Sequence, residues 1–78
     1  MRTMTCKQLG GACDQKFTAN TFEEIAALSK KHGAEMFQKK DIGHIRAMEI
    51  MKSRMPSPES FQQWFEAKKE EFETLPED

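Results

Sequence analysis

The chain has 78 residues, a length that makes one small domain spanning residues 1–78. Its composition is 37% hydrophobic, with six Phe, six Met and one Trp, which is too apolar for a disordered segment. The 12 basic and 13 acidic side chains nearly cancel, so the excess of Lys and Arg that phosphate binding requires is missing. The composition therefore predicts a folded domain that does not bind nucleic acid.

The size of the chain and its first residues bear on its stability and on its cellular compartment. A domain this small builds a core worth only a few kcal/mol, so a metal, a disulfide or self-association often adds stability. No apolar run is long enough to cross a bilayer, and residues 1–5 lack the apolar segment of a signal peptide. We therefore expect a cytoplasmic protein with no membrane partner, in which thiols stay reduced.

The first segment predicts a β-hairpin. Residues 3–9 alternate loosely between apolar and polar, and a second strand is expected over 14–19. Gly10 and Gly11 between them predict a tight turn, because glycine reaches the positive φ that hairpin turns need. A lone hairpin is marginal in water, so it must pack on helices or pair with a second copy of the chain. A homodimer is therefore one hypothesis.

The next segment predicts a helix that packs on this hairpin. Thr21 is the expected N-cap, and Glu24 completes a capping box with it. Gly33 weakens the helix, which either ends there or continues through Phe37. The hairpin and this helix form a predicted ββα unit over residues 1–37. The apolar stripe of the helix consists of Phe22, Ile25, Ala26, Ser29, His32 and Met36.

Two further helices are expected over residues 41–75. Asp41 is a candidate N-cap for a helix that ends near Arg54, and Ser57 followed by Pro58 marks the start of the last helix. The predicted fold class is therefore α+β, a β-hairpin packed on a helix and followed by two more helices. The expected apolar faces are Ile42, Ile45, Met48, Met51 and Met55 on one helix, and Phe61, Trp64, Phe65 and Phe72 on the other.

Cys6 and Cys13 flank the glycine turn, so a hairpin brings both sulfurs to its turn end. Zinc sites often collect two thiolates from such a turn and an imidazole from a following helix. His32 lies on the core-facing stripe of the predicted helix, where it can supply that imidazole. The alternative is that both cysteines are small buried hydrophobes and His32 is a core histidine.

A structural zinc site takes four ligands, and the fourth is not obvious from the sequence. The position one turn after His32 is Met36, whose thioether suits Cu(I) better than zinc. His44, near the start of the second predicted helix, and Asp14 are the available substitutes. The sequence therefore predicts a transition-metal site, with zinc the expected ion, formed by Cys6, Cys13, His32 and His44.

The first half of the chain resembles an uncharacterised bacterial family of domains described as predicted small metal-binding proteins. The resemblance lies in the segment Cys6-Lys7-Gln8-Leu9-Gly10-Gly11-Ala12-Cys13-Asp14, then Phe17, the helix start Thr21-Phe22-Glu23-Glu24-Ile25, and His32. That family has histidines one helical turn apart, and Met36 replaces the second of them here. The resemblance implies metal binding through Cys6, Cys13 and His32, and it does not cover the last two helices.

Two other functions fit the same residues. A metal-free interaction module would present the Met48–Met51–Met55 stripe and the aromatic face of the last helix to a protein partner. A thiol switch would oxidise Cys6 and Cys13 reversibly. An enzyme is not expected, because no catalytic set, phosphate loop or cofactor motif is present in the sequence.

Overall fold

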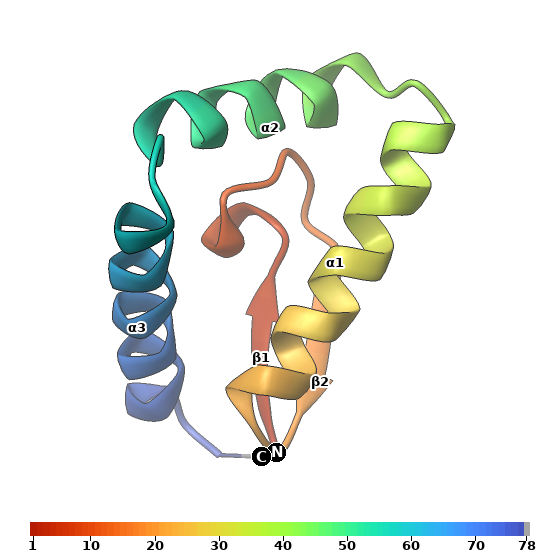
Figure 1. Cartoon of the computed structure of the whole chain (residues 1–78). Coiled ribbons are helices and arrows are strands. Elements are labelled where there is room, and N and C mark those ends of the chain that lie inside the picture. Colours follow the sequence, from red (N-terminus) through yellow and green to blue (C-terminus); the bar gives the residue numbers. More distant parts are fainter. Residues whose placement is uncertain (78) are drawn as a thin grey trace.

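The computed structural model describes residues 1–77, and it confirms the predicted α+β class: a two-stranded antiparallel hairpin precedes three helices. The helices lie around the hairpin on three sides, with α2 crossing beyond the end of the hairpin loop (Figure 1), and Glu77 lies beside the N-terminus, 3.8 Å from the Met1 ammonium. No helix within residues 1–77 has the length and apolarity needed to cross a membrane. The elements are β1 (Arg2–Thr5), a 3₁₀ turn η1 (Lys7–Leu9), β2 (Lys16–Ala19), α1 (Phe22–Gln38), α2 (Ile42–Arg54) and α3 (Pro58–Thr74).

The hairpin strands are shorter than predicted. They pair from Arg2 with Ala19 to Thr5 with Lys16, and residues 6–15 form a wide loop instead of a tight glycine turn. Thr5 ends the strand because its hydroxyl accepts from the Gln8 N–H at 3.2 Å, while the Gln8 side chain accepts from the Thr5 N–H at 2.7 Å. These two reciprocal hydrogen bonds have the pattern of a capping box. They start η1 at a place where an extended strand was expected.

The hydrophobic core lies between the inner face of the hairpin, α1 and the end of α3. Phe22 packs edge-on against Phe65 and Phe72, with ring centroids 4.9 and 6.0 Å apart. The Arg2 guanidinium lies over the Phe72 ring and donates to the Leu75 carbonyl, which fixes the C-terminal end against β1. The buried hydrophobic residues are Met4, Cys6, Leu9, Phe17, Ala19, Phe22, Ile25 and Phe72.

The predicted helix starts are correct. The Thr21 hydroxyl accepts from the Glu24 N–H, the Asp41 carboxylate from the His44 N–H, and the Ser57 hydroxyl from the Ser60 N–H at 3.2 Å. The first helix does not end at the glycine of its last third but continues to Gln38. All three helices thus begin where the sequence places them.

The apolar faces predicted for the last two helices are only partly buried. Ile42 is 67% exposed and Phe61 is 50% exposed, while the Met48 and Trp64 side chains are half-buried. The prediction overlooked that these helices flank the hairpin loop rather than pack against each other as a bundle (Figure 1). The buried position of α2 is a histidine, His44.

Candidate metal centre

Both cysteines and both histidines of the chain meet at one point. Cys6 and Cys13 come from the two sides of the hairpin loop, His32 from α1 and His44 from α2. One ligand atom from each of the four residues lies within 4.8 Å of the other three. Since the chain contains two Cys and two His in all, every thiol and every imidazole that it possesses belongs to this group. The group is positioned for metal binding.

The hairpin loop holds the two cysteines by backbone hydrogen bonds. The Cys6 N–H donates to the Gln15 carbonyl at 2.8 Å, and the Lys7 N–H donates to the Cys13 carbonyl at 3.1 Å. The Cys6 carbonyl also accepts from the Gly11 N–H at 2.8 Å. A Cβ atom at Gly11 would overlap the Cys6 sulfur, so glycine is what allows the chain to fold this closely around that thiol.

Each sulfur faces one imidazole. Cys13 Sγ lies 3.3 Å from His32 Nε2, and Cys6 Sγ lies 3.6 Å from His44 Nε2. The two imidazole rings meet edge-on, with centroids 5.2 Å apart. Phe17 on β2 packs against the ring of His32 at 5.6 Å. Two sulfur and two nitrogen ligand atoms therefore lie within 4.8 Å of one another, and no two of them come from adjacent residues.

Asp41 orients the His44 ring. Its Oδ1 accepts from the His44 N–H at 3.0 Å and lies 2.8 Å from His44 Nδ1. A hydrogen bond at Nδ1 leaves Nε2, the atom that faces Cys6, as the lone-pair nitrogen available to a metal. The same contact with Asp41 raises the pKa of His44 above its usual range. The sequence indicated Asp41 as a helix cap, and this second role was not predicted.

The two thiols differ in acidity. Burial raises the pKa of Cys6 above its ordinary value. Burial also acts to raise the pKa of Cys13, but a backbone hydrogen bond from Gln15 and the imidazole of His44 outweigh it, so the pKa is lowered. Cys13 is partly exposed and Cys6 is buried, and each must lose its proton to bind a metal, because the ligand is the thiolate.

The structure also separates the two candidates for a fourth ligand. His44 lies in the group, whereas the exposed Asp14 pairs with Lys7 at 3.4 Å. Met36, which occupies the position of the missing second histidine on α1, is half-buried. The imidazole that the sequence lacks one turn after His32 is thus supplied by a different helix.

Comparison with known proteins adds no relative to this description. Searches against protein-family models, curated proteins and solved structures found no match to the chain. The class of protein is therefore defined by its own fold and site: a small α+β domain with a Cys2His2 group positioned to bind metal.

Proposed function

We propose that this protein binds one zinc ion through Cys6, Cys13, His32 and His44, and that the ion has a structural or regulatory role. The observation that carries the proposal is the convergence of the four ligand atoms within 4.8 Å of one another. Zinc bound at about 2.3 Å from sulfur and about 2.0 Å from nitrogen in a tetrahedron separates its ligand atoms by about 3.3–3.8 Å. The sulfur–nitrogen distances of 3.3 and 3.6 Å already match that range.

The chemistry of the donors favours zinc over harder ions. Two thiolates and two neutral imidazoles suit zinc and exclude calcium and magnesium, which take oxygen ligands. Two thiolates also cancel the charge of a divalent ion, so the loaded site carries no net charge where Cys6 and His44 are buried. Asp41 would then hold His44 in place, as carboxylates behind zinc-bound histidines do.

The resemblance of residues 6–32 to a family of predicted metal-binding proteins points the same way and stays a prediction. A structural role agrees with the size of the core, because the free energy of metal binding becomes free energy of folding. The cytoplasmic location, the lack of enzymatic activity and a possible homodimer remain expectations of the sequence.

Metal analysis of protein purified without chelator tests the proposal. We expect about one zinc per chain, and cobalt-substituted protein should show the absorption of tetrahedral, thiolate-bound Co²⁺. Cys13→Ser and His44→Gln should each lower the zinc content well below one. Asp14→Asn, which changes a carboxylate beside Cys13 but outside the group, should leave it unchanged. Wild-type protein with no transition metal, and no uptake on adding zinc, would refute the proposal.

A thiol switch is a second candidate, because both cysteines are free and their sulfurs belong to the same 4.8 Å group. In that function a hydroperoxide would oxidise the two thiols to a disulfide and be reduced to an alcohol and water, the two thiol protons entering these products; hydrogen peroxide would give water alone. A thiol count on the zinc-loaded and the zinc-free protein after mild peroxide separates the two functions. Bound zinc should protect the thiols if the metal site is the resting state.

A further inference from the structure

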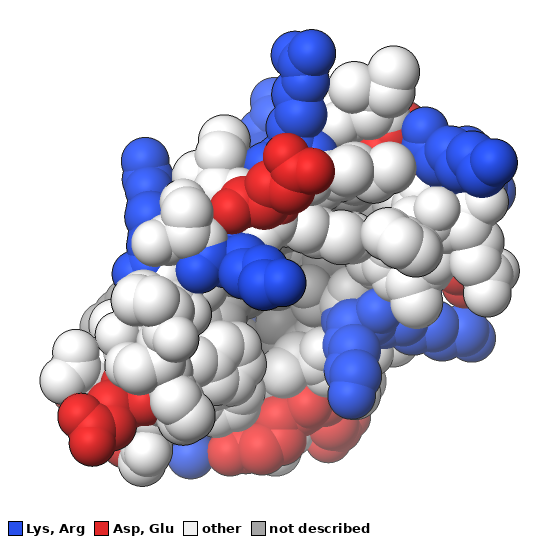
Figure 2. Space-filling view, turned by 45° about the horizontal axis from the view of Figure 1, so that its top comes forward, with Lys and Arg blue, Asp and Glu red and all other residues white. Residues whose placement is uncertain are grey.

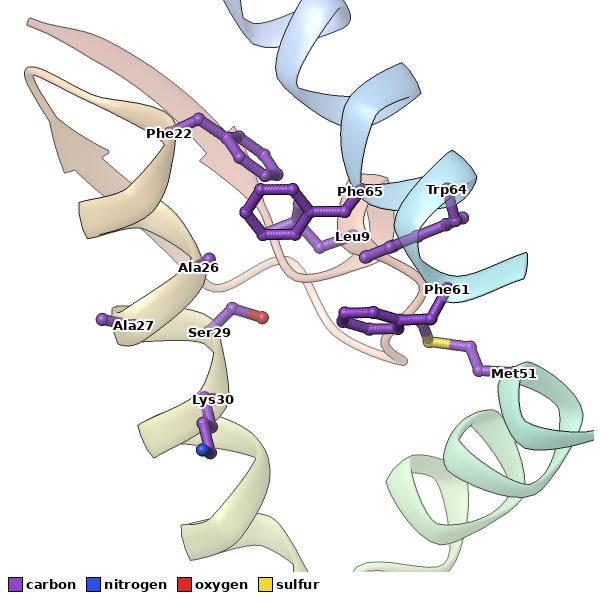
Figure 3. Close-up of a pocket in the computed structure, with 10 residues that line it drawn as sticks. All are labelled: Leu9, Phe22, Ala26, Ala27, Ser29, Lys30, Met51, Phe61, Trp64 and Phe65. Atoms are coloured by element: carbon purple, nitrogen blue, oxygen red, sulfur yellow. The ribbon is translucent and has the colours of Figure 1, made fainter. Parts of the chain in front are cut away.

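A hollow lies away from the metal centre, between α1, α3 and the end of α2. It has a volume of about 510 Å³, and none of Cys6, Cys13, His32 or His44 lines it. The rings of Phe61 and Phe65 extend from α3 toward α1 with Trp64 beside them, and Phe22 and Leu9 complete the apolar lining (Figure 3). Ligand pockets of 300–1,000 Å³ with apolar and aromatic walls are typical binding sites for small molecules.

The hollow continues into a basic one. A neighbouring depression of about 370 Å³ shares Met51 and Trp64 with the first, so the two adjoin. The charged residues lining the pair are all cations: Lys30 in the apolar part, and Lys7, Arg54 and Lys68 in the basic part. The chain has more acids than bases, yet no acid lines either hollow.

Two of these cations have no acidic partner among the residues that the structure describes. Lys7 pairs with Asp14 and Lys68 with Glu71, but no ion pair among residues 1–77 engages Lys30 or Arg54. Figure 2 shows a hollow in the uncharged surface with Lys and Arg side chains beside it, and acidic side chains at other points around it. An apolar chamber that opens onto unpaired cations is complementary to a molecule with an apolar body and one anionic end.

We propose that these hollows bind an amphipathic monoanion of the fatty-acid class. Its alkyl chain occupies the apolar hollow, and its carboxylate reaches Arg54 past Met51 and Trp64. A guanidinium binds a carboxylate through two parallel hydrogen bonds, which makes Arg54 the main anchor. Met51 has the flexible side chain that lets such a passage adapt to the width of a ligand. Phe61, half exposed in the free protein, loses its contact with water when the chain enters.

The test is a titration with decanoate below its micelle concentration, followed by fluorescence. Trp64 is the single tryptophan of the chain and lies at the junction of the hollows, so it reports directly on the site. We expect the Trp64 fluorescence to change with decanoate concentration and to reach a plateau. We expect Arg54→Gln to weaken decanoate binding about tenfold. Arg46→Gln, on the same helix but outside both hollows, should change it less than about twofold.

Two further measurements separate the parts of the proposal. Neutral 1-decanol should bind about tenfold more weakly than decanoate to the wild type, and equally to wild type and Arg54→Gln. Ala26→Leu narrows the apolar hollow and should weaken both ligands, while circular dichroism reports whether the variant still folds.

Several results would overturn the proposal. They are the lack of a saturable change, equal losses in the two arginine variants, and equal wild-type affinities for decanoate and decanol. Binding to phosphatidylglycerol vesicles without binding of free decanoate would identify a membrane surface as the source of the anion. A Trp64 signal that depends on protein concentration alone would make a second copy of the chain the occupant.

Discussion

Replacing Asp41 by Asn isolates its effect on the metal from its effect on the fold. Asn is as good an N-cap as Asp, so its side-chain oxygen can still accept from the His44 N–H and the start of α2 is retained. What is lost is the negative charge 2.8 Å from His44 Nδ1. Partners of this kind typically account for a 10–100-fold difference in metal affinity, or about 1.4–2.7 kcal/mol of binding free energy.

We therefore expect Asp41→Asn to weaken zinc binding at least about tenfold, measured at pH 7 by competition with a chromophoric chelator. Its melting temperature in excess EDTA should fall only slightly below that of the wild type, because the metal-free fold keeps the cap and loses only the contact between the Asp41 carboxylate and protonated His44. Asp14→Asn removes another carboxylate near the site and should change neither quantity. Unchanged zinc affinity in Asp41→Asn, or an equal loss in both variants, would refute the role assigned to Asp41.

Two other substitutions test the core and the hairpin loop. Phe72→Ala removes a ring that is 2% exposed and should lower the free energy of unfolding in urea by about 3–5 kcal/mol. Phe61→Ala, at a half-exposed position, should lower it by about 1 kcal/mol or less. Equal losses in the two variants would contradict the core described above. Gly11→Ala places a methyl group against the Cys6 sulfur and should lower zinc content and stability together. Gly33→Ala meets only ordinary van der Waals contact and should leave zinc content unchanged, so a similar loss in both glycine variants would argue against a special role of Gly11.

The parts of the fold that depend on local chemistry could be predicted from the sequence. Thr21, Asp41 and Ser57 each begin a helix because a short polar side chain accepts from a free N–H of the first turn. The length of the strands was missed for a similar local reason. Thr5 and Gln8 have the spacing of a capping box, and their exchange of hydrogen bonds outweighs the alternation of residues 3–9.

The candidate site was predicted as a set of residues but not as a geometry. The positions of Cys6, Cys13 and His32 follow from the hairpin and the stripe of α1. Whether His44 or Asp14 joins them depends on the direction in which α2 crosses the hairpin loop, and no local pattern encodes that direction. The exposure of Ile42 and Phe61 was not predicted for a similar reason. Hydrophobic periodicity identifies the apolar face of a helix but not the element that covers that face.

The buried position of α2 predicts that metal binding and folding depend on each other in this domain. Most helices in small proteins dock through aliphatic side chains, but the buried residue of α2 is His44, and its ring faces the Cys6 sulfur. Without a metal, an imidazole and a thiol at 3.6 Å contribute one weak hydrogen bond to docking. With zinc bound, the Cys6 sulfur and the His44 nitrogen would both coordinate the ion, which would hold α2 against the hairpin loop. We therefore expect hydrogen exchange in EDTA to be faster in α2 than in α1, whose Phe22 and Ile25 lie in the core, and zinc to slow exchange in α2 most. Uniform protection of all three helices by zinc would instead mean that the domain unfolds as a single unit.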